Sequence, residues 1–270
     1  MKRESIVPTV AWLGGAAAFF LRNVELLRGY DAQTRLMTPC VQTWALWALT
    51  AVLLIVLAAI CLRAPGGRPS GGQSGGAGSF YLALNATAAF LLMGAGALGL
   101  WQESRAYVKN PLAILAYAVC LLAGGAVIAT AAQVAHDRRS ARFPILLMVP
   151  SFATLLLLIA RYQRYAKQPV LSLCIWQLLA QVAAVLALYV MVSLAMGRGN
   201  AARVAVMSAW AIVLTLTSLG DARIGGIDAA TALTDAFAVL YLSGQAWLML
   251  RAEPEQSPLK QNDPEENDDE

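Results

Sequence analysis

Eight long apolar stretches decide what this chain can fold into. Each holds about 20 residues with few charged side chains, the length that an α-helix needs to cross a hydrocarbon layer of about 30 Å. Lipid cannot hydrogen-bond a polypeptide backbone, so stretches of this kind cross it as helices. The predicted spans are residues 6–27, 42–62, 79–101, 111–134, 144–161, 170–196, 201–219 and 228–250. The sequence therefore predicts an all-α fold, a polytopic transmembrane helix bundle of about eight spans.

The composition excludes three other classes of protein. Hydrophobic residues make up 59% of the chain and charged residues 13%, whereas a soluble domain averages about 25% charged residues. A globular cytosolic enzyme, a disordered protein and a disulfide scaffold are therefore excluded. Residues 1–252 form the predicted transmembrane helical domain, and residues 253–270, with eight of the 16 acidic residues, a disordered acidic tail. Residues 66–76, rich in Gly and Ser, are predicted to be a flexible tether.

Eight spans place both termini on one side of the membrane. Lys and Arg residues number 11 on that side and 9 on the side of the odd-numbered loops. By the positive-inside rule, both termini are predicted to be cytoplasmic. The lipid bilayer is the predicted partner of residues 1–252. Binding of nucleic acid is not predicted, because the chain has no soluble basic patch with groove-reading or stacking elements.

Charged residues in or beside a membrane span are costly, so they are the first candidates for a functional site. Here they gather where the spans meet the odd-numbered loops. The candidate ligand-binding residues are Arg22, Glu25, Glu103, Arg105, Arg161, Arg164, Asp221 and Asp235. A cavity with arginine donors and carboxylates would bind a small polar or anionic ligand through charge-assisted hydrogen bonds. The alternative interpretation is an interfacial belt of ion pairs and snorkelling arginines that binds nothing.

Asp235 is the most deeply placed acid of the later spans, about two turns into the last one. A carboxylate there loses its hydration and needs a cation, a hydroxyl group or water nearby. We expect Asp235 to face the bundle interior, near Arg22, Arg223 or a solvated cavity.

Several chemistries are excluded or weak. The single histidine, His136, lies in a predicted loop, which excludes histidine-based metal and haem sites and a Ser–His protease. The Tyr-Asp pair ending at Asp31 and the Gly-Asp pair ending at Asp221 resemble motifs of intramembrane aspartyl proteases. Ser218 stands where that motif has a glycine, and Asp31 lies in a loop. No catalytic residue, metal or cofactor is predicted.

The four cysteines are dispersed along the chain without CxxC spacing, and most fall within apolar stretches. They are predicted to be small buried hydrophobic residues rather than ligands or disulfide partners.

Two segments echo each other at an offset of 58 residues. Residues 106–112 (Ala-Tyr-Val-Lys-Asn-Pro-Leu) match residues 164–170 (Arg-Tyr-Ala-Lys-Gln-Pro-Val). Spans 3–4 and 5–6 are therefore candidates for a repeated helical hairpin of the kind that transporters contain. Loop chemistry alone also explains the echo, because Pro favours the first turn of a helix and Tyr and Lys anchor the membrane interface.

The segment Tyr-Gln-Arg-Tyr-Ala-Lys-Gln-Pro-Val at residues 162–170 resembles a recurrent motif in a family of uncharacterised polytopic membrane proteins of clostridial-type bacteria. The segment Gly-Tyr-Asp-Ala-Gln-Thr at residues 29–34 is similar to the part of those proteins that follows their first span. The resemblance implies a protein of the bacterial cytoplasmic membrane and supplies no activity.

Three functions stay open on the sequence. The first is a transporter-like or ligand-binding membrane protein whose polar site lies on the side opposite the termini. The second is a non-catalytic accessory or sensor subunit, which would have a protein partner and in which polar residues only hold helices together. The third, an intramembrane enzyme, needs two acids close enough to share a proton.

Overall fold

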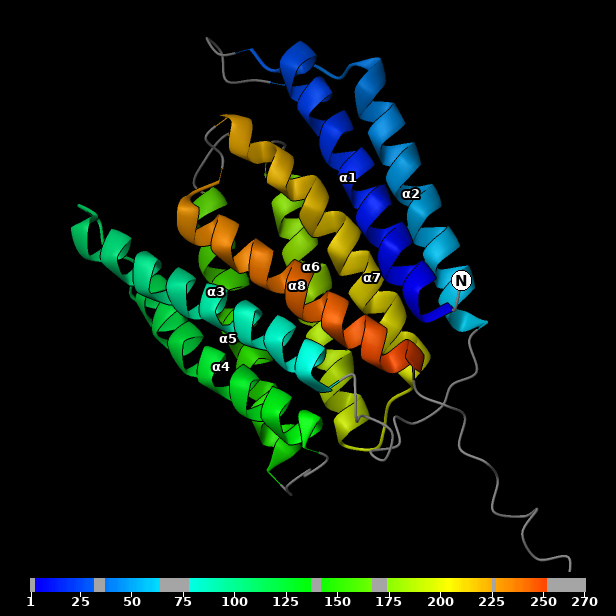
Figure 1. Ribbon diagram of the computed structural model, residues 1–270. Coiled ribbons are helices and arrows are strands. Elements are labelled where there is room, and N and C mark those ends of the chain that lie inside the picture. Colours follow the sequence, from blue (N-terminus) through cyan, green and yellow to red (C-terminus); the bar gives the residue numbers. More distant parts are fainter. Residues whose placement is uncertain are drawn as a thin grey trace, which may run out of the picture.

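Eight helices, each long and apolar enough to cross a membrane, form the computed structural model of the chain (Figure 1). The structure describes residues 3–31, 37–63, 78–136, 142–166, 174–224 and 227–251. The helices are α1 (Arg3–Gly29), α2 (Val41–Leu62), α3 (Gly78–Arg105), α4 (Pro111–Ala135), α5 (Phe143–Tyr165), α6 (Ile175–Ala195), α7 (Ala201–Ser218) and α8 (Ala229–Arg251). A short 3-10 helix, η2 (Leu219–Ile224), continues α7. The predicted all-α bundle of eight spans is confirmed.

Most helix bounds lie within a few residues of the predicted spans. The larger differences are at α3 and α5, which each continue about one turn further than predicted. These extra turns carry charged residues that pair with other helices, so they gain from staying helical where hydropathy alone would end the span. Helix α6 begins at Ile175 rather than at residue 170. The predicted tether (66–76) and acidic tail (253–270) lie outside the described residues.

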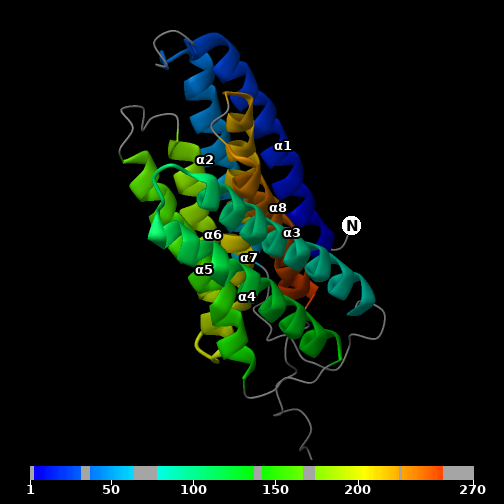
Figure 2. The ribbon, with the colours of Figure 1, turned by 90° about the vertical axis from the view of Figure 1, so that its left-hand side faces the viewer.

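Helix α7 occupies the centre of the bundle. It packs against α1, α2, α6 and α8, and α8 in turn packs against α3 (Figures 1 and 2). Within their central membrane stretches, 72% of the residues of α7 are buried, against 22% for α2. The outer faces of α2 and of the other peripheral helices are apolar, as contact with lipid requires.

Helices α3 and α4 form the most extensive pair of the bundle and lie side by side in Figure 2. Gly124 of α4 allows this close approach, because an added Cβ would lie 2.9 Å from the carbonyl oxygen of Ala89 on α3. Small residues serve this purpose in membrane bundles, where packing rather than water exclusion holds helices together.

One half of the sequence echo is explained by loop chemistry. Asn110 caps α4, its side-chain oxygen accepting hydrogen bonds from the backbone amides of Leu112 and Ala113, and Pro111 is the first residue of the helix. The matching proline, Pro169, lies outside the described residues, and α6 begins at Ile175. The two copies therefore do not start their helices at matching positions.

The ends of the bundle differ in chemistry. The start of α1 and the end of α8 lie at one end (Figure 1). The opposite end, where α1, α3, α5 and α7 finish and α2, α4, α6 and α8 begin, is called the charged end below. The candidate residues predicted from the sequence all lie there.

Candidate functional site

Three arginines organise the charged end. Each is paired with one or two carboxylates, at least one of them from another part of the chain, and each cluster is named after its arginine: Arg22, Arg161 and Arg164. Seven of the eight predicted site residues belong to these clusters, namely Arg22, Glu25, Glu103, Arg161, Arg164, Asp221 and Asp235. The structure thus brings together side chains that lie up to about 200 positions apart in the sequence.

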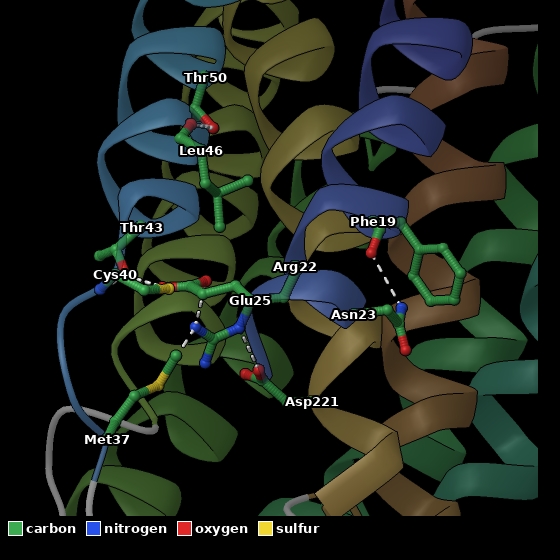
Figure 3. A network of polar contacts seen from close by, with 10 residues as sticks. All are labelled: Phe19, Arg22, Asn23, Glu25, Met37, Cys40, Thr43, Leu46, Thr50 and Asp221. Carbon is green, nitrogen blue, oxygen red and sulfur yellow. Dashed lines mark hydrogen bonds and ion pairs between the residues drawn. The ribbon is translucent and has the colours of Figure 1, made fainter. Parts of the chain in front are cut away.

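The Arg22 cluster joins α1 to η2 and is closed (Figure 3). The Arg22 side chain donates from Nε to Oδ1 of Asp221 at 2.7 Å and from Nη1 to Oε2 of Glu25 at 2.8 Å. All three residues are at most 1% exposed. The chain can pass this close because Gly220 has no side chain: an added Cβ would lie 2.8 Å from Cγ of Arg22. Arg22 therefore has a tightly packed place between two acids.

The Arg22 cluster contains more acid than base. Glu25 and Asp221 share one arginine, and the second carboxylate oxygen of Asp221, Oδ2, is buried without a hydrogen-bond partner in the part of the chain that the structure describes. A buried carboxylate needs a cation or hydrogen-bond donors beside it, so two acids that share Arg22 are less stable than two acids with an arginine each.

The Arg161 cluster lies between α5, α6 and α8. Nη2 of Arg161 donates to the hydroxyl of Thr234 at 2.5 Å, and Nη1 lies 3.7 Å from Oδ1 of Asp235. With its amide oxygen turned toward the guanidinium, Gln181 accepts from Nε at 3.1 Å and from Nη1. The Arg161–Asp235 ion pair is longer than the two ion pairs of Arg22. The reason is that Thr234 and Gln181 also hold the Arg161 guanidinium.

Asp235 faces the interior, as predicted, and is 5% exposed. Its partner is a correction to the expectation: it pairs with Arg161, whereas Arg22 pairs with Asp221 and Glu25. The end of α7 brings Asp221 against α1, which occupies Arg22. The side chain of Arg223, the other expected partner, lies outside the described part of the structure.

A small cavity of about 20 Å³ adjoins Asp235 inside the bundle. Its polar lining comes from four helices, and its residues are Thr154, Gln181, Thr215, Thr234 and Asp235, with Leu157, Ala180, Ala184 and Ala238. A space of this size holds about one water molecule, and the lining supplies the polar partners that a buried water needs.

The Arg164 cluster is open. Arg164 on α5 donates to Oε1 of Glu103 on α3, and its Nη1 lies 3.5 Å from Oδ2 of Asp228, just before α8. The side chain of Arg164 is 44% exposed and that of Asp228 is 32% exposed. All three border a cavity of about 580 Å³, whose other residues are Gln102, Ala106, Val108, Lys109, Asn110, Pro111 and Gln163. A cavity of this volume accommodates a small molecule.

Arg105, the eighth predicted site residue, lies outside all three clusters. Its guanidinium stacks on the ring of Trp101, 4.3 Å from the centroid, and the residue is exposed. Arg105 and Trp101 thus form the interfacial contact that the alternative interpretation expected of every charge at this end.

Sequence reasoning missed Asp228, Lys109 and Gln163. Asp228 had a readable signal: it caps α8, its Oδ1 accepting from the backbone amide of Thr231 at 2.7 Å, and an aspartate before an apolar stretch is a typical cap. Lys109 and Gln163 looked like ordinary interfacial residues, and only the meeting of α3, α4 and α5 places them around one cavity.

Other buried polar groups hold helices together. Gln245 on α8 donates to the Tyr81 hydroxyl on α3 at 2.7 Å, and Trp12 on α1 donates to the Ser243 hydroxyl at 2.9 Å. These contacts are interhelical hydrogen bonds of the kind found throughout membrane bundles.

All four cysteines are free. Cys61, Cys120 and Cys174 are buried as predicted, whereas Cys40 is only partly buried. Burial raises the pKa of the Cys174 thiol, just before α6, to about 11. Among the described residues no group of three or more His, Cys, Asp or Glu side chains could hold a metal ion.

Comparison with known proteins adds no relative to these observations. No family model, no curated protein and no solved structure matches the chain.

Proposed function

We propose that this integral membrane protein is transporter-like or ligand-binding, and that it takes a small zwitterionic molecule into the cavity beside Arg164. The observation that carries the proposal is the open cavity itself, which lies where four elements meet and is lined by both cations and carboxylates. An interfacial belt without a ligand would not need charges from four separate elements around one space of this volume.

The charge balance favours a ligand that carries a cationic group. Among the residues that the structure describes, six charged residues of the charged end are buried, two arginines and four carboxylates: Arg22, Glu25, Glu103, Arg161, Asp221 and Asp235. The half-exposed Arg164 and Asp228 add one charge of each sign. At the cavity itself, Glu103 and Asp228 are placed to hold a ligand ammonium group, because carboxylates near lipid are costly unless a cation compensates them. Lys109, on the wall of the cavity, is available for a ligand carboxylate.

The direction of access follows from the topology. With both termini in the cytoplasm, as the distribution of Lys and Arg predicts, the cavity opens on the outer side of the bacterial cytoplasmic membrane. A reporter fused after Arg251 and one inserted at Ala106 should then lie in different compartments.

Thermal unfolding of the purified protein in detergent tests the ligand class. The probes are three panels at equal concentration: amino acids and dipeptides, carboxylic acids without an amine, and amines without a carboxylate. We expect zwitterions to raise the melting temperature, because only they satisfy both signs of charge in the cavity. A shift with carboxylic acids alone would contradict the proposed ligand class.

Two variants localise the effect. Arg164→Gln removes the charge at the cavity, and Arg105→Gln removes a matched charge that stacks on Trp101 at the same end of the bundle. The stabilisation should be lost in Arg164→Gln and retained in Arg105→Gln. Equal stabilisation of both variants would place the ligand elsewhere.

A further inference from the structure

We propose that Asp235 is a proton-binding site in the interior of the bundle, served by a water molecule in the small cavity next to it. This inference deepens the proposed function, because it names the ion that the membrane domain takes in addition to its ligand. The two can fail independently, since proton binding at Asp235 is measured without any ligand.

The first argument is the pairing of Asp235. Its ion pair with Arg161 is 3.7 Å long, whereas Arg22 holds its two acids at 2.7 and 2.8 Å. Arg161 keeps neutral partners, the Thr234 hydroxyl and the Gln181 amide. When Asp235 becomes neutral, these two side chains still hold the guanidinium, so a proton can bind without leaving the arginine uncoordinated.

The second argument is the charge that surrounds Asp235. Among the described residues, the charged groups that interact with it are Arg161 on α5, Asp221 on η2 and Asp228 before α8. Two of these three are negative. Helix α6 contributes the neutral Gln181, and helix α7 contributes the neutral Thr215 and Ser218, the latter hydrogen-bonded to Asp235. One proton on Asp235 therefore reduces the excess of negative charge around Asp235 at the charged end of the bundle.

The third argument is the cavity. It has room for about one water molecule, and hydroxyl groups from α5, α7 and α8 line it, those of Thr154, Thr215 and Thr234. A water molecule there would donate to the Asp235 carboxylate and exchange protons with it. The rest of the lining is apolar, with Leu157, Ala180, Ala184 and Ala238, so the polar partners for a water are the threonines, Gln181 and Asp235.

The arrangement also connects the proton to the ligand cavity. Arg161 and Arg164 lie three residues apart on the last turns of α5, one paired with Asp235 and the other bordering the open cavity. A change in the Arg161 contact is therefore transmitted along one rigid helix to the residue at the cavity. Linkage is reciprocal: if ligand binding changes the proton affinity of Asp235 by some factor, protonation of Asp235 changes the ligand affinity by the same factor. Ligand binding should then depend on pH.

Infrared difference spectroscopy on the full-length protein in lipid tests the proposal directly. Difference spectra compare the protein in acidic and in alkaline buffer, once in H2O and once in D2O. Only the pH changes, and no other ligand is added. We expect a carbonyl-stretching band of a protonated, buried carboxyl group that titrates with pH and shifts in D2O. The band should be absent in Asp235→Asn and displaced in frequency in Asp235→Glu, which keeps the carboxyl group.

Two further variants guard against misassignment. Thr215→Val removes a hydroxyl of the cavity while keeping its shape, so the band should remain and shift in frequency as the hydration of Asp235 changes. Asp31→Asn removes an exposed carboxylate that follows α1 and should leave the band in place. A band that persists unchanged in both Asp235→Asn and Asp235→Glu, or no titrating band at any pH at which the protein stays folded, would overturn the proposal.

Discussion

The Arg22 and Arg164 clusters are built to the same plan and differ in one respect. In each, one arginine is shared by two acids from different parts of the chain. Arg22 and both of its acids are sealed inside the protein, whereas Arg164 and Asp228 are partly exposed beside a cavity of about 580 Å³. The comparison teaches that one arginine with two acids holds helices together when it is buried, and can bind a ligand when it borders a cavity.

The largest effect is expected from Arg22→Gln. The substitution leaves Glu25 and Asp221 buried without their cation, and breaking a buried ion pair costs about 3–5 kcal/mol. The variant should yield little monodisperse protein in fluorescence-detected size-exclusion chromatography. Arg105→Gln, which changes an exposed arginine at the same end, should elute like the unmodified protein. Normal folding of Arg22→Gln would show that the closed cluster is not a cohesive element.

Gly220→Ala tests how closely the Arg22 cluster is packed. The new Cβ would lie 2.8 Å from Cγ of Arg22, and overpacking of this kind costs about 1–3 kcal/mol. The melting temperature should fall clearly. Gly125→Ala is the matched control, because a Cβ at that helical position meets nothing within 4 Å. If both variants melt alike, the space around Arg22 is looser than the structure shows.

A smaller effect on stability is expected from Arg164→Gln. Its side chain and that of Asp228 are 44% and 32% exposed, but Glu103 is buried and loses its cation in the variant. Exposed ion pairs contribute about 0–1 kcal/mol, and the single buried carboxylate adds to that cost, so the melting temperature should fall less than in Arg22→Gln, which leaves two buried acids. A loss of stability as large as that of Arg22→Gln would make the Arg164 cluster structural and would weaken the proposed ligand site.

The smallest perturbation uses thiol chemistry to compare the two regions. Cys174 lies close enough to the Arg22 cluster to interact with Asp221, and burial raises its pKa to about 11. It therefore stays protonated at neutral pH and becomes thiolate only as the pH approaches that value. A membrane-impermeant maleimide at pH 7 should leave Cys174 unmodified and label Gln163→Cys, at the exposed edge of the cavity. Mass spectrometry of peptides from the labelled protein measures both and separates Cys174 from the partly buried Cys40, and labelling of Cys174 would show that water enters the closed region.

The number of helices and most of their bounds could be predicted from the sequence, because hydropathy over about 20 residues reports directly on the membrane. The charged end could be predicted for the same reason, since charges near lipid are rare. The pairing could not: Arg22 was as plausible a partner for Asp235 as Arg161, and the choice depends on how α7 ends beside α1. Nor could sequence separate Arg105, which only stacks on Trp101, from Arg164, which borders the cavity.

The contrast in apolarity and burial between α2 and the last two helices has a consequence for how the protein is made. Helix α2 is the most apolar span and among the least buried, whereas α7 and α8 are less apolar and the most buried. Helix α2 can leave the translocation channel for lipid unaided, but α8 carries Asp235 and gains little from lipid alone. Membrane insertion of α8 should therefore depend on helices already in place, and α8 expressed without the helices that precede it should stay partly outside the bilayer.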